Sequence, residues 1–390
     1  MAKKKKSSRQ QRSPARARTA TQSSPGEANV QKLTGLNIYR AVAIFMMMAA
    51  HSIRIQENYP TLATHPESAT LFDRFLLLFI TIEPIISAMF LFIAGFSLTL
   101  SFSKMIRKNP ARKLPWLQRI LGRAAALYGV AVIFFVAEYG FQWPDFLVSA
   151  GVLGTIALSI AISAGLLVWG GHAVWLIVAT LLCLAVTYGL EANNLTVTGL
   201  NAGAGGHLPL VVMGFLGTLY GLAYRRFGDN GLFGGLLLSA VIALLAFVAD
   251  YPNTFIYRSH FAWYASSLPA QWLESALNLF SRGNDSALVK AAFWNHSSIY
   301  PLRFTFVIVL FMVPAIKLFR RTQHRVIRFL DALGSYGLTI YVFHLVILAG
   351  LEVSGIKPQT GWQTLVLIAG LILTGYGAIR NRVNLDPGAG

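Results

Sequence analysis

The sequence predicts an all-α polytopic membrane protein, a bundle of about ten transmembrane helices preceded by a disordered basic tail. Three observations predict this class. Hydrophobic residues make up 55% of the 390-residue chain and charged residues only 12%, whereas soluble proteins carry about 25% charged residues. The apolar residues form runs long enough to cross about 30 Å of hydrocarbon as helices. The basic residues are concentrated between alternate runs.

The first 33 residues are predicted to form a disordered cytoplasmic tail, because they are rich in Lys, Arg, Ser, Ala, Gln and Pro and hold almost nothing apolar to bury. A transmembrane domain is expected at 34–380, followed by a second cytoplasmic tail at 381–390. The apolar runs predict spans at 35–53, 77–101, 117–138, 146–168, 173–190, 207–225, 231–250, 300–319, 334–352 and 362–379.

The distribution of basic residues predicts that both termini lie in the cytoplasm. With ten spans and an inner N-terminus, 25 of the 33 Lys and Arg residues fall on the inner side and 7 on the outer side. This asymmetry follows the positive-inside rule and predicts a multi-pass protein of the plasma membrane, in bacteria the inner membrane. The formal charge of +18 therefore reflects orientation among membrane lipids, and nucleic acid is not expected as a partner.

Two further features bound the function. The single cysteine, Cys183, lies in an apolar run, so an internal disulfide framework and a cysteine-based zinc cluster are excluded, and no metal is expected. The expected outer loop at 251–299 is long and aromatic. Its Trp and Tyr side chains could stack on sugar rings, but anchoring at the membrane interface is the commoner role of such residues.

Ionisable residues inside a span are costly, so each one is a functional hypothesis. Arg40 and His51 are eleven residues apart in the first expected span. At about 3.6 residues per turn they lie on the same face, about 16 Å apart along the axis, and Asn37 lies one turn before Arg40 on nearly the same stripe. An elongated substrate with an anionic head fits this face, with phosphates at Arg40 and its reactive end at His51. Coenzyme A thioesters have this shape.

Each residue of this pair also has a simpler interpretation. Arg40 could extend its side chain to the cytoplasmic interface, and His51 could be an interfacial histidine beside Arg54. Their spacing on one face of the helix favours a shared role over two separate ones.

The pair resembles the opening of the acyltransferase-3 proteins and of their relatives, the heparan-α-glucosaminide N-acetyltransferase-like membrane proteins. These begin with a Leu-Asp-x-Leu-Arg-Gly-like stretch that leads to the histidine. Here Asn37 stands where Asp is usual, and Ala41 where Gly is usual. Three more segments are similar to the family: Phe90 to Ser97 in the second span, Arg119 with Arg123 at the start of the third, and Ser335 to His344 in the ninth.

The resemblance extends over about residues 35–350. It implies acyl transfer from cytoplasmic acyl-CoA, with acetyl the expected group, to an acceptor that is commonly a sugar, at or beyond the outer face. Imidazole chemistry agrees with this activity. His51 could accept the proton of the attacking hydroxyl or amine as a general base, or it could attack the thioester and carry the acyl group.

Two further buried ionisable residues are candidates for the site. His344 lies near the middle of the ninth span, and either takes part in the thioester site or only hydrogen-bonds a neighbouring helix. Glu83 precedes Pro84 in the apolar stretch of the second span. Because that span runs inward, Glu83 is expected near the outer leaflet, where it could pair with Arg40 or orient a histidine such as His51.

Arg119 and Arg123 lie one turn apart at the inner end of the third span. Their planar guanidinium groups suit coenzyme A phosphates, although lipid headgroups and topology signalling more often explain such residues.

The sequence therefore predicts a membrane-bound acyltransferase that moves an acyl group from acyl-CoA to a hydroxyl or amine of an envelope glycan or glycolipid. The alternative is a transporter or flippase that uses the same buried Arg, His and Glu as a substrate or proton pathway. A structural subunit that recruits partners through its basic tail leaves the buried charges unexplained.

Overall fold

The computed structural model describes residues 33–64, 69–170, 173–193, 195–201, 206–250, 298, 300–320 and 324–385. Nearly all of the expected N-terminal tail and of the outer loop at 251–299, and the last five residues of the C-terminal tail, lie outside these ranges. The elements are α1 (Thr34–Arg54), α2 (Tyr59–Thr64), α3 (Leu71–Thr81), α4 (Glu83–Lys108), η2 (Pro110–Arg112), α5 (Lys113–Tyr139), α6 (Asp145–Val148), α7 (Gly151–Trp169), α8 (Ala173–Ala192), α9 (Val211–Phe227), α10 (Asp229–Asp250), α14 (Tyr300–Leu318), α15 (Arg325–Ser335), α16 (Gly337–Val353) and α17 (Gly361–Leu385).

The structure confirms the all-helical polytopic class. Within the described ranges, eight helices are long and apolar enough to cross a membrane, or nine if the bent pair α15–α16 is one span. The predicted span at 207–225 is α9, which has 17 residues and so lies at the lower limit of about 17–25 residues for a spanning helix. A helix therefore lies in each of the ten predicted ranges. Among the described residues, however, fewer than ten helices are long and apolar enough to cross a membrane.

The second predicted span is divided in the structure. Helix α3 ends at Thr81 and α4 begins at Glu83, with Ile82 as the junction. Pro84 explains the break, because proline lacks an N–H donor and its ring clashes with the carbonyl one turn earlier. Glu83 consequently lies in the first turn of α4 rather than inside a continuous span, and its carboxylate faces the positive end of the helix dipole.

The ninth predicted span is also broken. Helices α15 and α16 meet at Tyr336 with a bend of 77°. Gly334 and Gly337 flank the bend and lie against α1. A Cβ on Gly334 would be 1.7 Å from the carbonyl oxygen of Asn37, and one on Gly337 would be 2.8 Å from Cδ of Arg40. The two glycines therefore let the bend approach α1 more closely than any other residue would allow.

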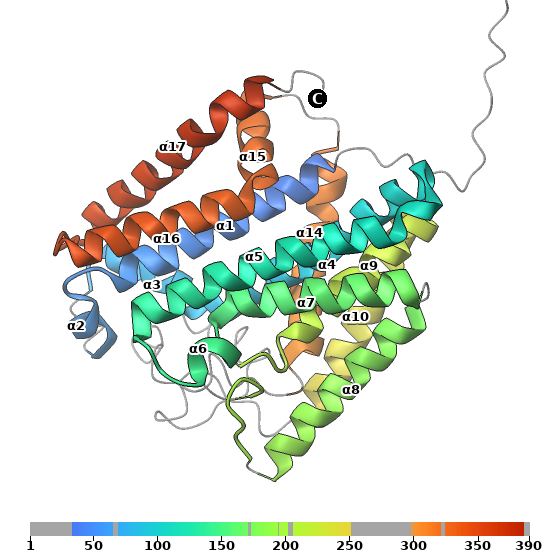
Figure 1. Ribbon diagram of the computed structural model, residues 1–390. Helices are drawn as coiled ribbons and strands as arrows, with labels where there is room; N and C mark the ends of the chain where they lie inside the picture. Colours follow the sequence, from blue (N-terminus) through green and yellow to red (C-terminus); the bar gives the residue numbers. More distant parts are fainter. Residues whose placement is uncertain are drawn as a thin grey trace, which may run out of the picture.

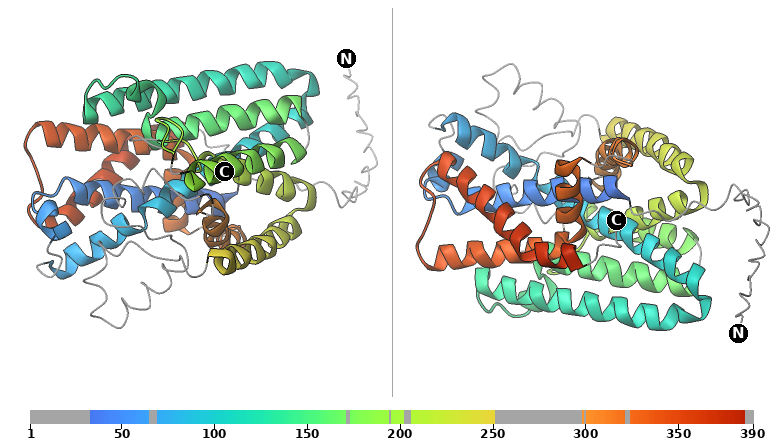
Figure 2. Two further views of the ribbon diagram at one scale, coloured as in Figure 1. Left: turned by 90° about the horizontal axis from the view of Figure 1, so that it is seen from below. Right: turned by 90° about the horizontal axis from the view of Figure 1, so that it is seen from above.

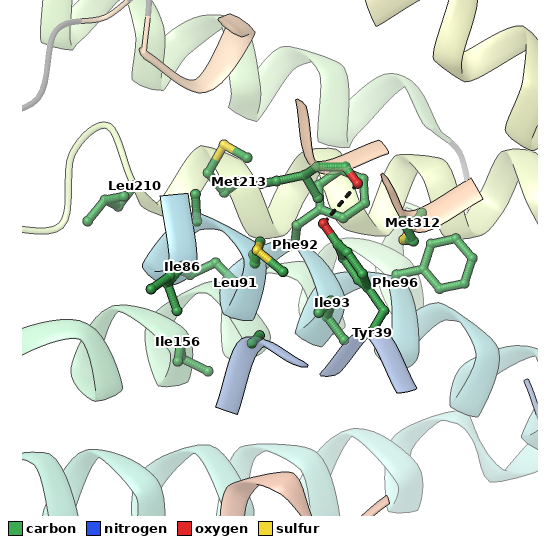
Figure 3. Packing of buried hydrophobic residues seen from close by; sticks show 14 of the residues in the cluster. Tyr39, Ile86, Leu91, Phe92, Ile93, Phe96, Ile156, Leu210, Met213 and Met312 are labelled. Carbon is green, nitrogen blue, oxygen red and sulfur yellow. Dashed lines mark hydrogen bonds between the residues drawn. The ribbon is translucent and has the colours of Figure 1, made fainter. Parts of the chain in front are cut away.

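Helix α1 lies inside the bundle, packed on α3, α4, α14, α15, α16 and α17. Figure 1 shows α16 running beside α1 and α17 crossing above them. Figure 2 shows α5 and α7 along one side of the bundle and α10 with α14 on the opposite side. The largest apolar cluster lies between α1, α4, α9 and α14, where the hydroxyl of Tyr39 donates to the carbonyl of Ile308 at 3.0 Å (Figure 3).

Candidate active site

His51 and His344 meet across the interface between α1 and α16. Nδ1 of His51 is 3.1 Å from Nε2 of His344. The ring planes differ by only 16° and the centroids are 5.3 Å apart, so the imidazoles lie end to end as an in-plane hydrogen bond requires. Because one nitrogen donates and the other accepts, the two rings cannot both be protonated. The His344 ring is fully buried, whereas the side chain of His51 is 18% exposed.

Glu83 extends this chain of polar groups on the other side of His51. Its Oε1 is 3.8 Å from Nε2 of His51, and its Oε2 accepts a hydrogen bond from the guanidinium of Arg54. The Glu83 side chain is 3% exposed and that of Arg54 is 41% exposed. The buried carboxylate therefore lies between a permanent cation and an imidazole, and it would stabilise a positive charge that develops on the His51 ring.

Two aromatic side chains border the histidines. The ring of Tyr341, one turn before His344 on α16, is 6.2 Å from that of His51 and 5.1 Å from that of His344. Phe90 of α4 packs edge-on against Tyr341 at 5.5 Å. These rings hold the imidazoles on an apolar wall, where an electrostatic contact with Glu83 is stronger than it would be in water.

Tyr59 of α2 lies at the end of the site that holds His51, Arg54 and Glu83. It lies in the short helix after α1 and hydrogen-bonds with Arg54. Burial raises the pKa of its hydroxyl, although the nearby Arg54 acts in the opposite direction. The phenol is therefore neutral at neutral pH, and Arg54 keeps its positive charge for Glu83.

Arg40 lies at the other end of the same face of α1, against the bend between α15 and α16. Its Nη1 donates to the carbonyl of Gly334 at 2.9 Å and to Oδ1 of Asn37 at 3.3 Å, and its Nη2 donates to Oγ of Ser97 at 2.6 Å. These acceptors are a carbonyl, an amide and a hydroxyl. Over the described part of the chain, no carboxylate lies within ion-pair distance of Arg40.

The donors of Arg40 are only partly used. A guanidinium carries five N–H groups, and those on Nε and Nη2 form one edge that matches two phosphate or carboxylate oxygens. Nη2 carries two N–H groups, of which one donates to Ser97, and none of the described residues accepts a hydrogen bond from Nε. Arg40 is thus held in place by neutral groups while a charged edge stays available for an anion.

The predicted geometry of α1 agrees with these contacts. Arg40 contacts the bend beside Gly337, and His51 contacts His344 two turns further along α16. Both therefore face the same pair of helices. Glu83 also lies beside His51, as one of the two arrangements predicted for it, and it is not an ion-pair partner of Arg40.

Arg119 and Arg123 lie elsewhere. Both are exposed on α5, which packs mainly on α7. Among the described residues, no interaction links either of them to Arg40 or His51. The described residues also contain no group of three His, Cys, Asp or Glu that could hold a metal ion.

Sequence reasoning missed Arg54 and Asp331. Arg54 was named only as the neighbour of an interfacial His51, although its place one turn after His51 was a usable signal for a role in the site. Asp331 accepts a hydrogen bond from Nδ2 of Asn37 at 2.8 Å. That contact joins α1 to α15, and no spacing in the sequence indicates it.

Comparison with known proteins agrees with the residues of α1. Residues 33–216 match the family model described as heparan-alpha-glucosaminide N-acetyltransferase, catalytic. The matched segment contains Asn37, Arg40, His51 and Glu83, and it ends before α15 and α16. No curated protein matches the chain. The match supports a membrane acetyltransferase, and over residues 33–216 the chain is similar to the heparan-α-glucosaminide N-acetyltransferase family.

Proposed function

We propose that this protein transfers an acyl group, acetyl in the first instance, from cytoplasmic acyl-CoA to a hydroxyl or amine of an envelope glycan or glycolipid. The observation that carries the proposal is the series of contacts Glu83–His51–His344. His51, in the middle of the series, lies on the same face of α1 as Arg40. The family match, which includes Arg40, His51 and Glu83, supports the reaction class.

The donor would lie along α1. Arg40 binds its phosphates through the Nε–Nη2 edge, and the extended pantetheine arm reaches the thioester to His51, about 16 Å further along the helix. In this arrangement the donor enters from the N-terminal end of α1, which is the cytoplasmic end if the positive-inside rule holds for this chain. Asn37 contributes by holding Arg40, and Arg119 and Arg123 attract the polyanionic donor from the exposed face of α5.

The chemistry needs one proton relay. The acceptor oxygen or nitrogen forms a bond to the thioester carbon as the carbon–sulfur bond breaks. His51 takes the proton of the acceptor and returns one to the leaving thiolate. If His51 first carries the acyl group itself, the thiolate leaves in that step and the acceptor attacks the acyl-imidazole in the next. In both routes Glu83 stabilises the positively charged ring, and His344 fixes its orientation.

A transfer assay tests this function. Protein reconstituted in vesicles is given labelled acetyl-CoA and candidate glycan or glycolipid acceptors, and wild type is compared with His51→Ala. We expect label transfer by the wild type and a loss of about a thousandfold in the variant, as removal of a general base commonly costs. His324→Asn is the matched control, because His324 caps α15 away from His51 and Asn is a good N-cap.

Two results of this assay would contradict the proposed function. Transfer that survives His51→Ala contradicts the role given to the histidine. Substrate-dependent flux across the vesicle wall, without transfer from any acyl donor, supports the transporter instead.

A further inference from the structure

Asn37 lies between a cation and an anion. Its Oδ1 accepts from Nη1 of Arg40 at 3.3 Å, and its Nδ2 donates to Oδ1 of Asp331 at 2.8 Å. A carboxamide can do both at once, because its oxygen accepts and its NH₂ group donates. The order Arg40–Asn37–Asp331 therefore connects α1 to α15 through three side chains.

The carboxylate of Asp331 is one amide away from Arg40 rather than in contact with it. It provides a counter-charge for the guanidinium without occupying the edge formed by Nε and Nη2. A carboxylate at position 37 would contact Arg40 directly and neutralise it. Here the negative charge has its place on α15 instead.

The same contact fixes the bend. Gly334, one turn after Asp331 on α15, accepts from Nη1 of Arg40 at 2.9 Å. Helix α15 is thus attached to α1 at two points, through Asn37 and through Arg40. Because α16 continues from the bend to His344, these attachments also determine where His344 stands relative to His51.

We propose that Asp331 is a positioning residue that acts through Asn37: together they hold Arg40 with its Nε–Nη2 edge available for the phosphates of the acyl donor. The proposal rests on the proposed function for the identity of that anion. The pairing of Asn37 with Asp331 stands on the contacts alone, and it can be tested without turnover.

Exchange of the two residues provides the test. The purified proteins are the wild type, Asn37→Asp, Asp331→Asn and the double variant with both changes. Two quantities are measured for each: the unfolding temperature in detergent, and its increase on addition of coenzyme A. Asp229→Asn is the control, since Asp229 is a carboxylate that pairs with Arg320 rather than with Asn37 or Arg40.

We expect the unfolding temperature to follow the pairing. Asn37→Asp places two carboxylates at the 2.8 Å contact, which lowers the unfolding temperature. The new attraction to Arg40 offsets less, because that contact is the longer one at 3.3 Å. The double variant restores an amide opposite a carboxylate and recovers the wild-type value. An unfolding temperature in the double variant no higher than in Asn37→Asp overturns the pairing.

Donor binding follows a different pattern. In both Asn37→Asp and the double variant a carboxylate contacts Arg40, so the affinity for coenzyme A falls by about tenfold, the usual scale for one charged hydrogen bond. Asp331→Asn leaves Asn37 only a neutral acceptor on α15, so Arg40 is held less firmly and the affinity for coenzyme A falls, by less than in Asn37→Asp. An affinity equal to that of the wild type overturns the positioning role of Asp331. Full recovery of coenzyme A binding in the double variant overturns the role of Arg40's free edge.

The proposed function and the pairing of Asn37 with Asp331 can be contradicted separately. A wild type that neither transfers acetyl groups nor is stabilised by coenzyme A contradicts the proposed function, while recovery of the unfolding temperature still supports the pairing. A wild type that transfers acetyl groups without recovery in the double variant contradicts the pairing alone.

Discussion

Two helix interfaces in this protein are built with glycine, and they are used differently. Between α4 and α9, a Cβ on Gly95 would be 2.0 Å from the carbonyl oxygen of Gly214, and one on Gly217 would be 1.9 Å from that of Phe92. Between α1 and the α15–α16 bend, Gly334 and Gly337 allow a similar approach. The first interface holds apolar packing and hydroxyl contacts to the backbone, whereas the second holds Arg40, His51 and His344.

The difference indicates where stability and function are separated. In a membrane, close backbone approach replaces the hydrophobic effect as a source of helix association. The α4–α9 interface uses that approach for packing alone. The α1–α16 interface uses it to bring ionisable side chains together at a cost in desolvation, which is expected at a functional site rather than at a structural one.

The largest effect is expected from a substitution that disrupts the packing between α4 and α9. Gly217→Ala forces α4 and α9 apart, because the new methyl group meets the backbone of Phe92. We expect a loss of about 3 kcal/mol of stability, the upper end for overpacking, with unchanged transfer per folded molecule. Thermal unfolding and specific activity together measure this.

Gly337→Ala is the matched change in the other interface. Its methyl group would meet Cδ and Cγ of Arg40 and Cδ1 of Ile44, which are side-chain atoms rather than backbone. We expect Gly337→Ala to raise the KM for the acyl donor with little change in the free energy of unfolding, in contrast to Gly217→Ala. Equal losses of stability in both variants would contradict it.

A smaller effect is expected at Glu83. Glu83→Gln keeps the shape of the side chain but removes the charge that stabilises a protonated His51. We expect kcat to fall about tenfold, corresponding to about 1.4 kcal/mol, with an unchanged donor KM.

Asp73→Asn is the control for Glu83→Gln. Asp73 is also a buried carboxylate, but it hydrogen-bonds with Gln56 and Thr70 instead of a histidine. A similar loss of kcat in both variants would show that Glu83 has no special relation to His51.

The smallest effect is expected at the exposed arginines. Replacing Arg119 and Arg123 together by Ala removes two positive charges from α5 but no contact to the site. We expect the donor KM to rise about twofold at low salt and the difference to vanish at high salt, because exposed charges are screened within about 10 Å at 0.1 M salt. A tenfold, salt-independent rise would place the donor phosphates on α5 instead.

The relative positions of site residues were easiest to predict from the sequence where the residues lie on one helix. Helical periodicity alone places Arg40 and His51 on one face of α1, and the direction of the second span brings Glu83 towards His51. The breaks at Ile82 and Tyr336 were not predicted, because both lie within apolar runs that read as single spans. Pro84 and the pair Gly334 and Gly337 were the local signals.

Contacts between distant segments were predicted only in part: His344 was a candidate for the thioester site, but its direct contact with His51 was not predicted. The pairing of His51 with His344 and of Asn37 with Asp331 each joins residues almost three hundred positions apart. Such pairs depend on the packing of α15 and α16 against α1, which a single sequence does not specify. Arg54 was missed for another reason, since a basic residue at a helix end is usually explained by topology.

The most direct test of the account separates binding from chemistry along α1. Initial rates of acetyl transfer are measured over a range of acetyl-CoA concentrations for wild type, Arg40→Gln and His51→Gln. The account predicts that Arg40→Gln raises the donor KM by about tenfold at near wild-type kcat, and that His51→Gln lowers kcat by about a thousandfold at wild-type KM. Transfer that is unchanged by His51→Gln, or an Arg40→Gln defect confined to kcat, would contradict it.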